Sequence, residues 1–179
     1  MPETTARGVD RDRDVRDREV VITRVVDAPA RLLFAAYSKP EHVRRWFGPA
    51  GYPLTTCEMD FVEGGRFTFA MTGPDGREGP RFGGRYVEIV KDRRVVYENG
   101  FFELPDGMPK EVMGTMRVTV SFDEQKDGKT KLTIHTLFDS KAMRDAHGGF
   151  GFEEVSASTI PTLVEVARSI GAASSGGAR

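Results

Sequence analysis

The spacing of hydrophobic and polar residues changes several times along the chain, and each change marks an expected element. Residues 19–26 are rich in β-branched side chains, which predicts a strand. Asp27 and Pro29 then form a typical helix start, with Asp27 near the cap. Pro40 ends this helix and opens a short second one over residues 41–46.

From residue 54 to residue 139 the hydrophobic period is mostly two, as in strands that bury one face. Short breaks rich in glycine, aspartate and lysine separate the apolar runs, which favours hairpins and an antiparallel meander. Two runs precede a turn at residues 73–76. Further strands are predicted at about 82–91, 94–103, 112–123 and 130–138.

The last part of the chain is helical in pattern. Residues 141–147 predict a short polar helix that a glycine-rich break interrupts. Apolar residues from Phe152 to Ile170 then recur every three or four positions and predict a long amphipathic helix, which Pro161 should kink. This order predicts an α+β fold, in which one antiparallel sheet of about six to seven strands packs against the helices.

The two ends differ from the domain between them. Residues 1–17 contain nearly alternating arginines and acidic residues and few apolar side chains, which predicts a disordered charged tail. A short helix with Asp–Arg pairs is the alternative. Residues 171–179 are rich in glycine, alanine and serine and predict a flexible tail. The folded domain is therefore expected at residues 18–170, and both tails are expected to be dispensable for folding.

The net charge, the hydrophobic runs and the cysteine content exclude several kinds of binding partner. The net charge of −1 offers no bulk field for nucleic acid, and no apolar run is long enough for membrane insertion. The N-terminus lacks the apolar stretch of a secretory signal. A single cysteine, Cys57, permits no intrachain disulfide and no cysteine cluster for zinc. A cytoplasmic location fits these features.

Several segments, in this order, resemble a known family. They are Asp27-Ala28-Pro29, the stretch 39–49 (KPEHVRRWFGP), Asp60 with Gly64-Gly65-Arg66, residues 73–76 (GPDG), residues 84–89 and residues 137–145. Together they resemble the START-like (SRPBCC) superfamily, and most closely its branch named after the activator of the heat-shock-protein ATPase. The resemblance implies a helix-grip fold, in which a curved sheet wraps around a long C-terminal helix after two short helices. It implies no single activity, because the superfamily includes lipid and hormone binders, polyketide cyclases, hydrolases and chaperone regulators.

A cavity between sheet and helix needs a few polar groups on the inward strand faces. Tyr86 shares a strand phase with Glu88, Asn99 with Phe101, and Thr136 with neighbouring apolar residues, so all three polar side chains are expected to point inward. Each could instead satisfy a neighbouring polar group. The full set of expected ligand-binding residues is Trp46, Met59, Phe69, Tyr86, Asn99, Phe101, Thr136, Phe152 and Ser156.

Ser156 marks a departure from the resemblance. After a Gly-x-Glu-Glu segment, here residues 151–154, relatives often carry Gly-Trp, whereas this chain has Val155-Ser156. The smaller side chain predicts a pocket that accepts a ring-sized apolar molecule. Repacking by neighbouring aromatic residues is the alternative.

Tyr86, Asn99 and His147 are the candidates for acid–base catalysis. His147 precedes the glycine break, where it is either a general base or a plain helix-end histidine. His42 and His135 are expected at the surface. No ligand spacing among histidine, cysteine and acidic residues predicts a metal site, and no cofactor is expected.

Three functions follow. The first is the binding of a small apolar, aromatic or amphipathic molecule. The second is a cofactor-free cyclase, dehydratase or isomerase that acts in the same cavity. The third, implied by the family resemblance, is regulatory contact with a chaperone ATPase. A homodimer is also left open.

Overall fold

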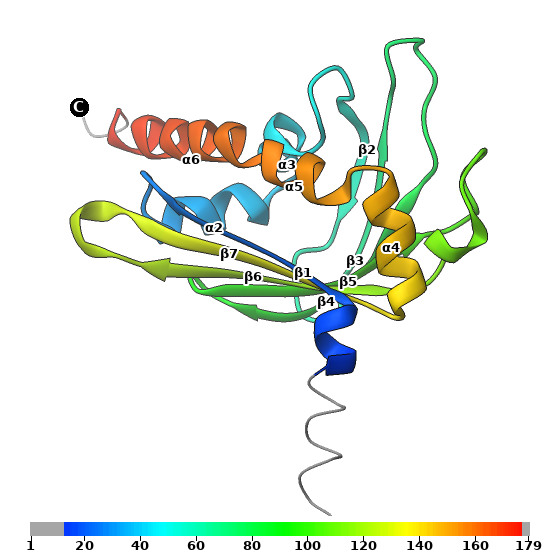
Figure 1. Ribbon diagram of the computed structural model, residues 1–179. Helices are drawn as coiled ribbons and strands as arrows, with labels where there is room; N and C mark the ends of the chain where they lie inside the picture. Colours follow the sequence, from blue (N-terminus) through cyan, green and yellow to red (C-terminus); the bar gives the residue numbers. More distant parts are fainter. Residues whose placement is uncertain (1–12, 177–179) are drawn as a thin grey trace, which may run out of the picture.

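Seven antiparallel strands form one curved, open sheet in the computed structural model, which describes residues 13–176 (Figure 1). The strand order is β1-β7-β6-β5-β4-β3-β2, so each strand from β2 to β7 pairs with the next along the chain. The strands are β1 (Glu19–Val26), β2 (Leu54–Met59), β3 (Arg66–Met71), β4 (Phe82–Val90), β5 (Arg94–Phe101), β6 (Met116–Glu124) and β7 (Thr130–Phe138). The predicted α+β helix-grip fold is confirmed.

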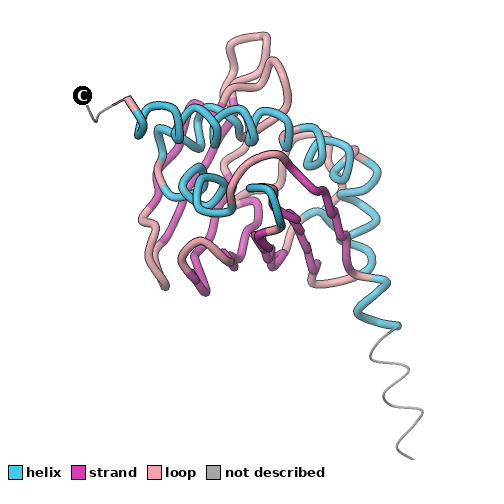
Figure 2. Tube along the Cα trace, turned by 90° about the vertical axis from the view of Figure 1, so that its left-hand side faces the viewer, coloured by secondary structure: helices cyan, strands magenta, loops and turns pink. Residues whose placement is uncertain are grey.

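The helices gather on the concave side of the sheet (Figures 1 and 2). They are α2 (Ala30–Ser38), α3 (Pro40–Trp46), α4 (Lys141–Gly149), α5 (Phe152–Ser158) and α6 (Ile160–Ser175), with short 3-10 turns η1 (Lys110–Val112) and η2 (Lys126–Gly128). The core fills the space between them and the sheet, and Leu33, Leu132, Phe138 and Leu163 are fully buried there. No described helix is long and apolar enough to cross a membrane.

The C-terminal helical segment is interrupted close to Pro161, where the sequence predicted a kink. It divides at Thr159 into α5 and α6, and Pro161 lies in the first turn of α6. Proline has no N–H for the helix ladder, so it fits best at a helix start. As a result α6 packs mainly on α2 and α3, whereas α5 runs on toward α4 (Figure 1).

Described helices extend into both segments that were predicted to be tails. Residues 13–17 form a helical turn, and Asp14 pairs with Arg18, whose guanidinium donates to the Phe138 carbonyl oxygen. At the other end α6 continues to Ser175, and a Cβ at Gly171 would lie 2.7 Å from Leu32 Cδ1. Helix packing therefore orders residues that composition alone assigned to a tail. The rest of the predicted tails, residues 1–12 and 177–179, lies outside the described residues.

Two irregularities shift the predicted strands. Gly114 has a φ of 136°, so β6 begins at Met116 rather than near residue 112. A β-bulge between Tyr86 and Glu88 breaks the expected shared phase. Tyr86 faces the core, whereas Glu88 pairs with Arg94 on the other side of the sheet.

Candidate ligand-binding cavity

Aromatic side chains from two helices and three strands enclose a small inner cavity of about 30 Å³. Period-two alternation along β3, β4 and β5 directs their side chains inward, and α2 and α3 close the space from the other side. The lining residues are Tyr37, Val43, Trp46, Phe47, Phe67, Phe69, Phe82, Tyr86, Tyr97 and Asn99. Their rings meet mostly edge to face, as between Phe67 and Tyr97, whose centroids are 5.6 Å apart.

Three of the chain's four tyrosines border this cavity: Tyr37, Tyr86 and Tyr97. Among the described residues none of their hydroxyls forms a hydrogen bond. Burial raises the pKa of each hydroxyl, and for Tyr37 and Tyr86 the nearby Tyr97 adds to the effect. All three are therefore neutral donors near neutral pH.

Asn99 is the only asparagine of the chain, and its side chain is unpaired at the edge of the inner cavity. Oδ1 of Asn99 and Nε of Arg18 are the fully buried side-chain atoms without a partner in the described part of the chain. Buried polar groups are nearly always hydrogen-bonded, because an unpaired one lowers the stability of the fold. The amide oxygen of Asn99 is therefore expected to be destabilising.

A wider groove of about 260 Å³ continues outward from the inner cavity. The two spaces share Phe47, Phe82 and Asn99. Together they lie near the lower end of the ~300–1,000 Å³ typical of small-molecule sites. The remaining groove residues are Met71, Gly100, Phe101, Met116, His147, Phe150, Phe152, Val155 and Ser156.

His147 is the ionisable group of this groove, and its side chain is packed between aromatic rings. Its ring stacks on Phe101 at 6.0 Å between centroids and also contacts Phe138 and Phe152. Nε2 donates to the Val112 carbonyl oxygen at 3.0 Å. Burial lowers the pKa of the imidazole, so the ring is neutral and Nδ1 keeps its lone pair.

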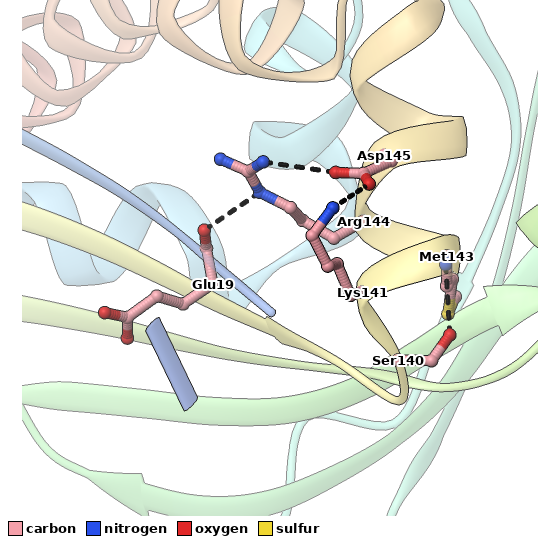
Figure 3. Close-up of polar contacts among 6 residues, drawn as sticks. All are labelled: Glu19, Ser140, Lys141, Met143, Arg144 and Asp145. Atoms are coloured by element: carbon pink, nitrogen blue, oxygen red, sulfur yellow. Dashed lines mark hydrogen bonds and ion pairs between the residues drawn. The ribbon is translucent and has the colours of Figure 1, made fainter. Parts of the chain in front are cut away.

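Polar contacts cap and brace α4, which carries His147, and one of them reaches the start of β1 (Figure 3). Ser140 caps the helix by accepting from the Met143 N–H, as expected of a serine in that position. Arg144 donates to the Glu19 carbonyl oxygen and to Asp145, which also accepts from Lys141. The His147 imidazole itself is held by Val112 and by the surrounding aromatic rings.

A comparison with models of protein families shows which family the chain belongs to. A family model described as activator of Hsp90 ATPase homolog 1-like protein matches residues 27–166. The chain belongs to this family.

Solved structures from several bacteria share the fold of this chain. A protein from Arthrobacter aurescens has 27% sequence identity and a TM-score of 0.75, with coverage of 87% of this chain and 89% of that one. One from Nitrosomonas europaea has 21% identity and a TM-score of 0.74, with 87% and 97% covered. One from Mycobacterium smegmatis has 24% identity and a TM-score of 0.71, with 86% and 92% covered. No curated protein matches the sequence significantly.

On this family fold, seven of the nine residues expected to bind a ligand line one or both spaces. Trp46, Phe69 and Tyr86 line the inner cavity, and Asn99 lines both spaces. Phe101, Phe152 and Ser156 line the groove.

Met59 and Thr136 line neither space. Met59 packs against the core, and Thr136, although it points inward as predicted, is 2% exposed on β7 beside β1 and β6, away from the aromatic cluster. The inward phase of a strand was therefore not sufficient to place a residue at the cavity.

The other histidines lie away from the cavity. His135 contacts Glu19 at 2.7 Å, and His42 Nδ1 donates to the Ala35 carbonyl oxygen. Cys57 is buried, as expected for a core position on its strand. Within residues 13–176 no three histidine, cysteine or acidic side chains come close enough to hold a metal ion.

Several residues that line the two spaces were not predicted from the sequence. Tyr37 lies on the apolar stripe of α2, and Tyr97 and Phe82 lie on the same strand faces as Asn99 and Tyr86. The alternation of side chains along the strands could have predicted Tyr97 and Phe82. Nothing in the sequence alone indicated that the Tyr37 side chain would meet them.

Proposed function

We propose that the protein binds a small, largely apolar molecule in the inner cavity and its adjoining groove. The observation that carries the proposal is the unpaired, buried amide of Asn99 at the junction of two aromatic-lined spaces. A polar group without a partner in an apolar wall is expected where a ligand supplies the partner.

Ser156→Trp tests this proposal, because Ser156 lines the groove. The larger side chain should fill the space, so the variant should keep its fold and lose binding of an apolar, uncharged fluorescent probe such as N-phenyl-1-naphthylamine. Ser158→Trp is the matched control, since Ser158 is exposed two residues away on the same helix. Failure of the wild type to bind any apolar probe, with Ser156→Trp destabilised by ~1–3 kcal/mol, would mean that the space is already filled.

A cofactor-free enzyme in the same cavity is the second candidate, and His147 is the observation in its favour. A neutral imidazole with a free Nδ1 lone pair beside an apolar groove can act as a general base. Native mass spectrometry of the purified protein would identify a bound molecule. If that molecule is turned over and His147→Gln binds it without turnover, the protein is an enzyme rather than a binder.

Contact with a chaperone ATPase stays a prediction from the family description. A chain that stimulates such an ATPase but retains no small molecule would favour this function over the other two.

A further inference from the structure

The polar groups of the inner cavity indicate what part of a ligand would enter it. The neutral hydroxyls of three tyrosines and the amide of Asn99 belong to residues that line this space of about 30 Å³. Among residues 13–176 they form no hydrogen bond with protein groups. The space is far smaller than the ~300–1,000 Å³ of a whole small-molecule site, so only a small part of a ligand would enter it.

We propose that the ligand is an aromatic molecule with a hydroxyl substituent, whose hydroxyl enters the inner cavity beside Tyr97 and Asn99 while its ring occupies the groove. This proposal rests on the proposed function and names its ligand class.

A hydroxyl group matches both kinds of partner. It can accept a hydrogen bond from the Tyr97 hydroxyl and donate one to Oδ1 of Asn99. A carbonyl oxygen can only accept, so it would leave the Asn99 oxygen unpaired. The terminal torsion of an asparagine side chain is broad, so the amide can turn toward the substituent at little cost.

Charged substituents do not fit the same space. No lysine, arginine, aspartate or glutamate lines the inner cavity or the groove. A carboxylate, phosphate or ammonium group would be taken out of water without an opposite charge, which costs far more than burying a neutral hydroxyl.

The groove offers faces and edges for the ring. Phe47 and Phe82 stand at its junction with the inner cavity, and Phe101, Phe152 and the His147 imidazole line its outer part. Aromatic rings pack well in such surroundings through offset and edge-to-face contacts.

A matched pair of probes tests the proposal: 2-naphthol, and 2-methylnaphthalene, in which a methyl group replaces the hydroxyl. Binding is followed by calorimetry and by the emission of Trp46, the only tryptophan, which lines the inner cavity. The wild type should bind the naphthol about tenfold more tightly or better, as expected for a satisfied buried hydrogen bond.

Variants locate the hydroxyl. The preference should be lost in Asn99→Leu and reduced in Tyr97→Phe. It should be unchanged in Tyr52→Phe, which removes the one tyrosine hydroxyl outside the cavity, on a side chain that is 45% exposed. Tyr97→Phe keeps the test valid if Asn99→Leu folds poorly.

Equal binding of the two probes, or a preference that survives both cavity variants, would overturn this inference and leave the proposed function intact. If neither probe binds, and no other apolar probe does, the proposed function itself fails.

Discussion

Asn99 combines a local loss of stability with a position in the proposed binding site. Its amide oxygen is buried and unpaired, whereas the surrounding wall is aromatic. Natural proteins retain such groups mainly at functional sites, where local cost is tolerated.

We expect Asn99→Leu to be more stable than the wild type by about 1 kcal/mol, because an apolar side chain of similar size removes an unsatisfied buried group. In a domain of this size the thermal midpoint should rise by ~2–4 °C. Differential scanning calorimetry measures it. A clear fall in the midpoint would indicate that the amide is satisfied in solution, for example by an ordered water molecule.

His147 should make stability depend on pH. Burial lowers the pKa of its imidazole in the folded protein, whereas the unfolded chain has the ordinary value of ~6.5. The unfolded state therefore binds the proton first as the pH falls. The stability that the neutral ring contributes is present above about pH 6.5 and is lost as the pH falls below that value toward the folded pKa.

Chemical denaturation at pH 7 and pH 5 measures this effect. His147→Gln keeps a donor for the Val112 carbonyl oxygen but does not titrate. We expect its loss of stability between the two pH values to be smaller than that of the wild type. Equal losses would mean that His147 is not the responsible group.

At the scale of elements, the division of the C-terminal segment into α5 and α6 shapes the groove. Phe152, Val155 and Ser156 line the groove from α5, whereas α6 packs on α2 and α3. The break at Thr159 separates α5, which lines the groove, from α6, which packs on α2 and α3.

The contact between α2 and the end of α6 gives a test of where the domain ends. We expect Gly171→Val to lower stability by ~1–3 kcal/mol, because its side chain would collide with the buried Leu32. Ala173→Val, on the exposed side of the same helix, is the control and should change stability little. Urea unfolding curves give the free energy of unfolding of both variants and of the wild type. Wild-type stability in Gly171→Val would restore the original prediction of a loose tail from residue 171.

At the scale of the whole molecule, stability should depend on packing rather than on a metal ion. The described residues contain no cluster that could hold one, and the core is continuous from the sheet to α6. We expect a chelator such as EDTA to leave the thermal midpoint unchanged. We also expect elemental analysis of untagged protein to find no stoichiometric zinc, iron or copper. A fall in the midpoint on chelation, reversed by one metal, would contradict this expectation.

The sequence by itself determined the elements and much of their inward faces. Residues 19–26 and 130–138 were predicted to be strands with the bounds that the structure has, because β-branched runs between turn residues are a local signal. Alternation along the strands predicted at about 82–91 and 94–103 also placed Tyr86, Asn99 and Phe101 on the side where the cavity lies. These features depend on residues that are close together in the sequence, so the sequence alone is enough to predict them.

Only the tertiary structure decided which inward residues meet. Tyr37 on α2 faces the tyrosines of β4 and β5 because α2 packs on the concave side of the sheet, whereas Thr136, equally inward on β7, lies away from the cavity. The bulge after Tyr86 turned Glu88 outward, and packing against Leu32 extended α6 to Ser175. Such outcomes depend on contacts between segments far apart in the chain, whose packing overrides local composition and periodicity.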